Sequence, residues 1–176
     1  MYQKKFCREA VLLVLTVFFA MAVVTPVLRA GKIQLPEDTE LKLQFASGMK
    51  ISSGNVSPGI PLLVYLAEPV KIGGKVIIEE GAEGKAEVLE TESSSRPGKP
   101  GYIRVGFVEL SPRGEYDTAD GSPIKLKGEI EFTGKGRKLL SYLFIFGLFI
   151  KGTQGEVPVD AVYTAEVAET VVMQSE

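Results

Sequence analysis

The sequence predicts an all-β domain: a small antiparallel barrel or sandwich of about eight or nine strands, with an N-terminal signal peptide and one apolar insert. Apolar and polar residues alternate in residues 40–45 and 124–132. Turn residues such as Ser, Gly, Asn and Pro separate the remaining apolar runs. The first thirty residues have a composition of their own, with cations followed by an apolar run. The spacing favours a closed barrel, although the pattern alone fits a sandwich as well.

The two alternating stretches are the clearest strands. Residues 40–45 read Glu-Leu-Lys-Leu-Gln-Phe, so every second side chain is apolar. Residues 124–132 alternate in the same way, with Gly128 among the apolar positions. Alternation of this kind buries one face of a strand and leaves the other in water. A glycine on the inner face predicts a bend or a close approach of two backbones at residue 128.

Five further runs are rich in β-branched and aromatic residues and are predicted to be strands. They are Pro61–Glu68, Lys75–Glu79, Lys85–Thr91, Tyr102–Leu110 and Ala161–Ala168. Because Pro61–Glu68 is apolar almost throughout, we predict a central strand covered on both faces. The polar stretch Ser93–Gly101 is predicted to be a connection between two strands, and Asp117–Gly121 a hairpin turn rather than a calcium loop.

Residues 1–30 resemble export signals in their order of features. Lys4, Lys5 and Arg8 precede an apolar run from Ala10 to Val24, and Ala30 stands before Gly31. This order predicts a secretory signal peptide, or alternatively an uncleaved anchor, since 19 residues from Ala10 to Leu28 are close to a bilayer's thickness. Both interpretations leave residues 31–176 as a single exported β-domain in the periplasm or cell envelope.

The segment 139–150 departs from the β pattern. It reads Leu-Leu-Ser-Tyr-Leu-Phe-Ile-Phe-Gly-Leu-Phe-Ile, without alternation and without a polar face. At 1.5 Å per residue such a helix is roughly 18 Å long, too short to cross a hydrocarbon core of about 30 Å. Three interpretations stay open: a buried core element, a loop that dips into a membrane surface, or a contact with an envelope protein. The residues predicted for a membrane or partner contact are Lys135, Arg137, Lys138, Tyr142, Phe144, Phe146, Phe149 and Lys151.

The composition argues against several classes of site. The chain has no His and one Cys, and Cys7 lies within the predicted signal peptide, so the exported part lacks His and Cys metal ligands, a His general base and a thiol nucleophile. We therefore predict that the protein is not an enzyme and needs no metal or other cofactor. Without residues 1–30 the net charge is −5, which gives no electrostatic footprint for nucleic acid.

Residues 70–88, Val-Lys-Ile-Gly-Gly-Lys-Val-Ile-Ile-Glu-Glu-Gly-Ala-Glu-Gly-Lys-Ala-Glu-Val, resemble a stretch of small exported bacterial β-domains, V-x-V-x-G-K-V-V-I-P-K-G-A-x-x-x-G-x-V. Ile150-Lys151-Gly152 and residues 157–167 resemble later parts of the same domains, so the likeness runs from about Leu41 to Val172. Glu79-Glu80 and Asp160-Ala161 depart from the Pro-Lys and Gly-Thr of that pattern. The resemblance implies an exported β fold without an assigned activity, and it carries over no functional residue.

The first of these stretches is also distantly similar to the outer-barrel domain of conjugation and type IV secretion channel proteins, which implies an envelope scaffold by analogy of fold. Together these expectations favour a non-catalytic exported β-domain that acts as a scaffold or interaction module. The alternative is a β-barrel that binds an apolar ligand or a membrane lipid between its inward-facing Leu, Ile and Phe side chains.

Overall fold

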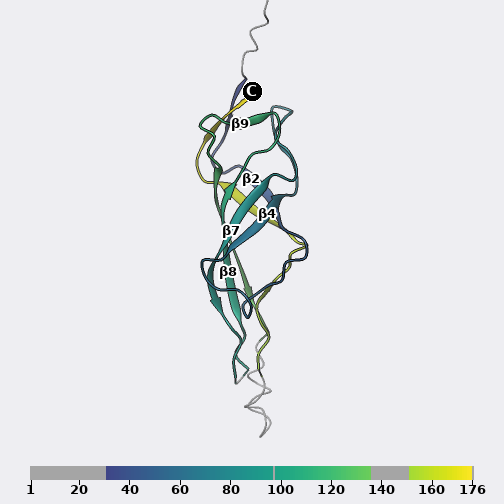
Figure 1. The fold of residues 1–176 in the computed structure, drawn as a ribbon, viewed down its shortest axis with the longest axis vertical. Coiled ribbons are helices and arrows are strands. Elements are labelled where there is room, and N and C mark those ends of the chain that lie inside the picture. The colour runs from purple at the N-terminus through teal and green to yellow at the C-terminus, as the bar shows by residue number, and fades with distance from the viewer. Residues whose placement is uncertain (1–30, 97, 136–150, 176) are drawn as a thin grey trace, which may run out of the picture. The chain divides into compact units, whose positions relative to one another are not determined.

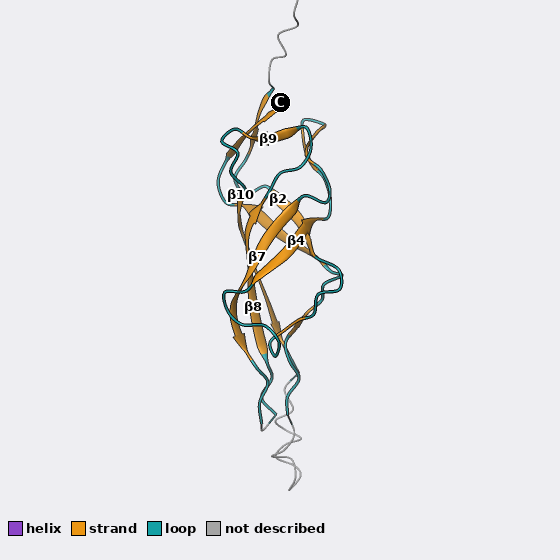
Figure 2. Cartoon of the chain, viewed as in Figure 1, coloured by secondary structure: helices purple, strands orange, loops and turns teal. Residues whose placement is uncertain are grey.

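The computed structural model describes residues 31–96, 98–135 and 151–175, and every regular element in these ranges is a β-strand (Figures 1 and 2). Residues 31–176 form one compact unit. The strands are β1 (Lys32–Leu35), β2 (Glu40–Phe45), β3 (Ile51–Ser52), β4 (Pro61–Leu66), β5 (Val70–Ile72), β6 (Lys75–Ile78), β7 (Glu83–Glu92), β8 (Tyr102–Leu110), β9 (Tyr116–Thr118), β10 (Ile124–Lys127), β11 (Glu129–Thr133), β12 (Glu156–Val157), β13 (Val162–Val167) and β14 (Val171–Ser175).

Six of these strands close into an antiparallel barrel. The hydrogen-bonded order is β10-β13-β2-β4-β7-β8, and β10 pairs again with β8, so the sheet returns to its starting strand. Strand β11 extends β10 along the first half of β8. The predicted all-β fold and the favoured barrel closure are therefore confirmed.

The barrel is built from the period-two pattern of its strands. In β2 the apolar residues Leu41, Leu43 and Phe45 are buried, whereas the polar residues between them remain accessible. The inward residues of the other barrel strands are Leu62, Val64, Leu66, Ala86, Val88, Ile103, Val105, Phe107, Leu110, Ile124, Leu126, Ala165 and Val167. Removing these side chains from water supplies the main driving force for folding.

All seven predicted strand regions are strands, with one change. The run 124–132 forms two strands, because Gly128 takes a φ of +133° and separates β10 from β11. The bend that the sequence predicted at this glycine is therefore confirmed. Six strands of two to five residues were not predicted: β1, β3, β5, β9, β12 and β14.

The prediction that Pro61–Glu68 is covered on both faces is wrong. In β4 Leu62, Val64 and Leu66 point into the barrel, but Leu63 is 41% exposed on the outer face. A barrel this small has only one apolar side, so an outward leucine meets solvent even in a central strand.

The predicted hairpin at Asp117–Gly121 is also wrong in its connection. A turn is present, and the Asp120 carboxylate accepts hydrogen bonds from the Ser122 amide and hydroxyl. However, this turn joins β9 to β10, and these strands belong to different sheets. Local turn residues do not determine which strands pair on either side of them.

The strand registers define two ends of the barrel. At the first, which we call the termini end, β2, β7 and β10 begin and β4, β8 and β13 finish. The three-stranded sheet β1-β14-β9 and the hairpin β5-β6 are connected there, together with Gly31 and the C-terminus (Figure 1). At the opposite end, the neck end, lie the loop 93–101, the two-stranded ribbon β3-β12 and the junctions of the apolar insert.

Candidate functional site: the neck of the apolar insert

The apolar insert is joined to the barrel at one point, which we call the neck: residues 134–135 after β11 and residues 151–153 before β12. The Thr153 amide donates a hydrogen bond to the Lys135 carbonyl at 3.2 Å. In return the Lys135 amide donates to the Thr153 hydroxyl at 2.5 Å. The described residues just before and just after the insert therefore lie next to each other.

The loop 93–101 forms the third side of the neck. The Gly101 amide donates to the Thr153 carbonyl at 2.9 Å, and the Gly134 amide donates to the Gly101 carbonyl at 2.8 Å. Within the loop, Ser95 and Lys99 exchange two backbone hydrogen bonds of 3.0 Å each. The predicted connection between two strands is confirmed, since the loop joins β7 to β8, and it also holds the neck in place.

Three glycines allow the backbones of the neck to approach closely. A Cβ atom at Gly134 would stand 2.0 Å from the Thr153 carbonyl oxygen, and one at Gly152 would stand 2.2 Å from the Lys99 carbonyl oxygen. At Gly155 the corresponding distance to the Phe132 carbonyl oxygen is 2.5 Å. None of the three has a positive φ, so space rather than backbone conformation requires glycine here.

A buried polar network fixes the base of the neck. The Ser53 hydroxyl donates to Gln154 Oε1 at 2.7 Å and accepts from the Gly155 amide at 3.1 Å. Gln154 Oε1 also accepts from the Ser94 amide at 2.9 Å, and both serines are buried. Buried polar groups with satisfied hydrogen bonds specify one arrangement, because breaking them leaves a desolvated donor or acceptor.

No pattern in the sequence predicts this network. Its members come from the β3 turn, the loop after β7 and the strand entry before β12, and Ser53 and Gln154 are 101 residues apart in the chain. The turn that contains Ser53 is stabilised by the Asn55 side chain, whose Oδ1 accepts from the Ser52 amide at 2.8 Å.

The charged side chains around the neck are cationic. The last paired residues of the barrel strands at this end are Glu92 of β7, Tyr102 of β8 and Thr133 of β11, which lie side by side across the sheet. We call them the last ladder row. Beyond this row, in residues 93–96, 98–101, 134–135 and 151–154, the charged residues are Arg96, Lys99, Lys135 and Lys151, all exposed. We call these four residues the tip cations. Lys99 forms an ion pair with Glu92, a surface contact that contributes little in water.

The structure places two of the predicted contact residues. Lys135 and Lys151 lie in the two chain segments of the neck, one before and one after the insert. Arg137, Lys138, Tyr142, Phe144, Phe146 and Phe149 lie outside the described residues, as does the predicted signal peptide. The loop contributes Arg96 and Lys99 to the same region, which sequence reasoning did not connect with the insert.

A cavity of about 500 Å³ lies at the termini end beside the β9–β10 turn and is lined in part by Asp120, Lys125 and Glu169. Lys125 Nζ lies 2.9 Å from Glu169 Oε1, and this hydrogen bond raises the pKa of the lysine. The hydrogen bonds from Ser122 lower the pKa of Asp120. Lys125 is therefore held by Glu169 within this cavity.

Within the described ranges, no three His, Cys, Asp or Glu side chains are grouped so that they could hold a metal ion. The same residues contain no helix that is long and apolar enough to span a bilayer. Comparisons with protein-family models, with curated proteins and with solved structures found no match to this chain.

Proposed function

We propose that this protein is a non-catalytic exported domain of the cell envelope that acts as a scaffold or interaction module, with residues 139–150 as its contact segment. The observation that carries the proposal is the neck. A closed barrel holds both ends of the insert together through reciprocal hydrogen bonds between Lys135 and Thr153.

The neck supports this function because the described residues on either side of the insert are held together by the barrel end itself. The strands of the barrel supply their own apolar interior, and the hydrogen bonds of the neck belong to the backbone of the barrel end. A rigid scaffold that presents one connecting segment is the usual way in which β folds carry binding residues. Tight glycine packing at Gly134 and Gly152 keeps that presentation fixed.

The composition of the insert supports a contact role as well. Residues 139–150 contain four aromatic side chains and no charge, while cations stand on both sides. Exposed apolar patches bordered by polar residues mark membrane and protein contacts in soluble domains, and the proposal assigns residues 139–150 to such a patch. The absence of His from the whole sequence is consistent with a role that involves no catalysis.

The test replaces residues 139–150 with a Gly/Ser linker of the same length in the full chain. We expect the variant to keep a β-type circular dichroism spectrum and the size of the parent in solution, and to lose its membrane fraction or its captured envelope partner. Unfolding of this variant would show that the segment is part of the core, and the proposal would then fail.

A matched control changes apolar side chains elsewhere. Leu63 and Val162 are exposed on the outer wall of the barrel, in β4 and β13 rather than in the segments of the neck. The double variant Leu63→Ser/Val162→Ser should fractionate like the parent protein. A loss equal to that of the linker variant would mean that the barrel wall, rather than the insert, makes the contact.

A further inference from the structure

The two ends of the domain carry opposite charge. At the termini end, residues 31–39, 67–82, 111–123 and 168–175 contain nine acids and four cations. The acids are Glu37, Asp38, Glu68, Glu79, Glu80, Glu115, Asp117, Asp120 and Glu169, and the cations are Lys32, Lys71, Lys75 and Arg113. At the neck end, residues 46–60, 93–96, 98–101, 134–135 and 151–160 contain five cations, the four tip cations and Lys50, and two acids, Glu156 and Asp160.

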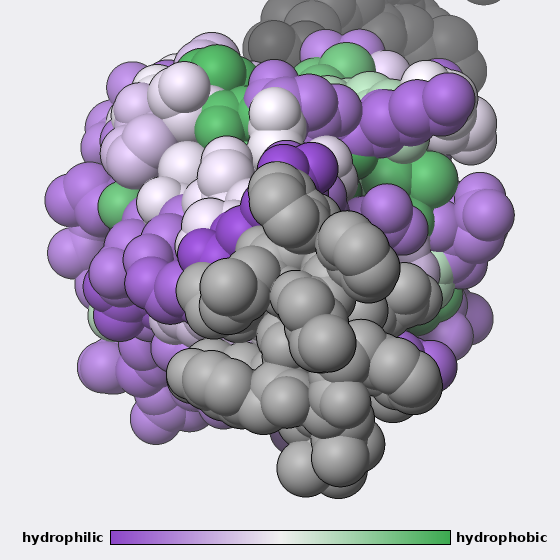
Figure 3. Space-filling view, turned by 90° about the horizontal axis from the view of Figure 1, so that it is seen from below, coloured by the Kyte–Doolittle hydropathy of each residue, from purple (hydrophilic) through white to green (hydrophobic). Residues whose placement is uncertain are grey.

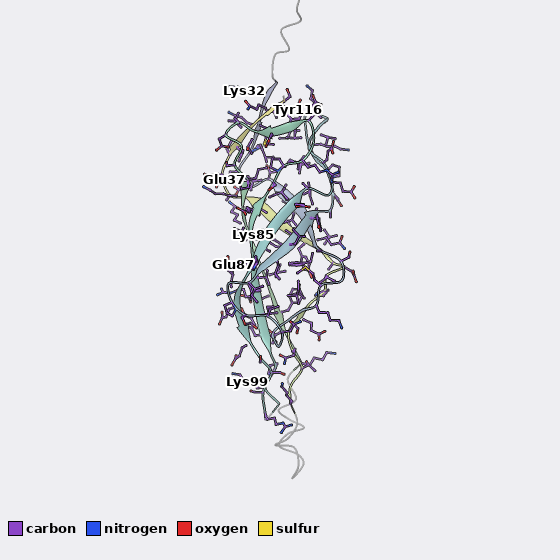
Figure 4. The ribbon with its side chains drawn as sticks, in the orientation of Figure 1. Lys32, Glu37, Lys85, Glu87, Lys99 and Tyr116 are labelled. Atoms are coloured by element: carbon purple, nitrogen blue, oxygen red, sulfur yellow. The ribbon has the colours of Figure 1, made fainter. Side chains whose placement is uncertain are left out.

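The tip cations form one group, although they come from three chain segments. The Gly152 amide, next to Lys151, donates to the Ser95 carbonyl, next to Arg96, and Gly152 is packed against the Lys99 backbone. Lys135 is hydrogen-bonded to Thr153, two residues after Lys151. Figure 4 shows Lys99 at the opposite end of the domain from Lys32 and Tyr116. In the view from the neck end, the coloured surface beside the grey residues is mostly hydrophilic or intermediate, with apolar groups toward its edges (Figure 3).

We propose that the tip cations dock the domain onto an anionic lipid bilayer, an inference that rests on the proposed function and names the partner of the same end. Cations that surround the base of an apolar segment match anionic headgroups above an acyl interior. The acidic termini end is repelled by the same surface, so the charge separation also orients the domain on approach.

Docking in this orientation has a consequence for the rest of the chain. Gly31, where residues 1–30 are joined to the domain, lies at the termini end and is hydrogen-bonded to Ser175. A bilayer bound by the tip cations is therefore at the other end of the barrel from the point where the N-terminal segment is attached. In this orientation the neck end faces the lipid. The termini end, where residues 1–30 are attached, faces away from it.

The test measures co-sedimentation with vesicles of equal parts phosphatidylglycerol and phosphatidylcholine, using protein isolated from the exporting host so that all variants share one N-terminus. A basic side chain near an anionic surface strengthens binding about fivefold. We expect Lys99→Gln/Lys135→Gln/Lys151→Gln to weaken binding about a hundredfold. Binding of the parent protein should fall as salt rises, because the tip cations are exposed and screened.

The control Lys32→Gln/Lys71→Gln/Lys75→Gln removes the same charge from the termini end and should keep the binding of the parent. Equal losses in the two triple variants, or equal binding to pure phosphatidylcholine, would overturn the inference. So would head-to-tail self-association that depends on the tip cations and replaces vesicle binding. In each of these cases the linker variant of residues 139–150 still decides the proposed function by itself.

Discussion

At the scale of single residues, the neck depends on glycines that leave no room for a methyl group. We expect Gly152→Ala to lower the free energy of unfolding by about 1–3 kcal/mol, since its Cβ would stand 2.2 Å from the Lys99 carbonyl oxygen and 2.9 Å from the Pro100 nitrogen. Backbone atoms have no alternative rotamer, so the loop 93–101 must move. Urea unfolding monitored by circular dichroism measures the change.

The control for this substitution is Gly31→Ala. The nearest atom to a Cβ at Gly31 is the Ser175 hydroxyl at 3.8 Å, and its φ is not positive. Stability of this variant should stay within about 0.5 kcal/mol of the parent protein. If Gly152→Ala were equally stable, the neck would have more freedom than these contacts indicate, and the fixed presentation of the insert would lose its support.

At the scale of elements, one strand run becomes two because of a single residue. Gly128 has a φ of +133°, a region that side chains avoid, and it lies against Ala165 of β13, 3.4 Å from the position of a Cβ. The bend lets β10 close the barrel against β13 while β11 continues along β8 toward the neck. We expect Gly128→Ala to destabilise the protein by about 1–3 kcal/mol in urea unfolding.

Gly106→Ala is the matched variant for Gly128→Ala. It lies on the neighbouring strand β8, its φ is not positive, and a Cβ there would meet only the side chain of Leu89, which is half-exposed and able to move. Its effect should be below about 1 kcal/mol. Similar losses for both variants would indicate that lost space, rather than backbone conformation, matters at residue 128.

The sequence predicted the elements whose evidence is local. Strands β2 and β13 carry their own alternation, since a residue and its second neighbour face the same side of a sheet. The short strands β1, β9 and β14 carry too few residues for such a pattern, and their strand conformation depends on partners distant in the chain.

The neck could not be predicted from the sequence for the same reason, because the registers of β7, β8 and β11 bring residues 93–101 to it. The interpretations of residues 1–30 and 139–150 remain predictions.

At the scale of the whole molecule, the barrel and the sheet β1-β14-β9 share one core. Leu35, Tyr116 and Met173 from the three strands of that sheet are buried in the same cluster as the barrel residues. A continuous core predicts a single cooperative unfolding transition rather than two. The charge separation between the two ends therefore belongs to one compact unit with a shared core, so an electric field acts on both ends of the same domain.

Met173 tests that continuity, because it lies in the central strand of the end sheet and is fully buried. We expect Met173→Ala to lower the free energy of unfolding by about 2–5 kcal/mol, as for other large core side chains. Its neighbour Val172 points the opposite way and is 37% exposed, so Val172→Ala should cost less than about 1 kcal/mol. Amide hydrogen exchange should then speed up in the barrel strands as well as in β1 and β9, because a shared core loses stability as a whole. Faster exchange confined to β1, β9 and β14 would instead show that the end sheet opens independently, and the termini end could then reorient its charges while the barrel stays closed.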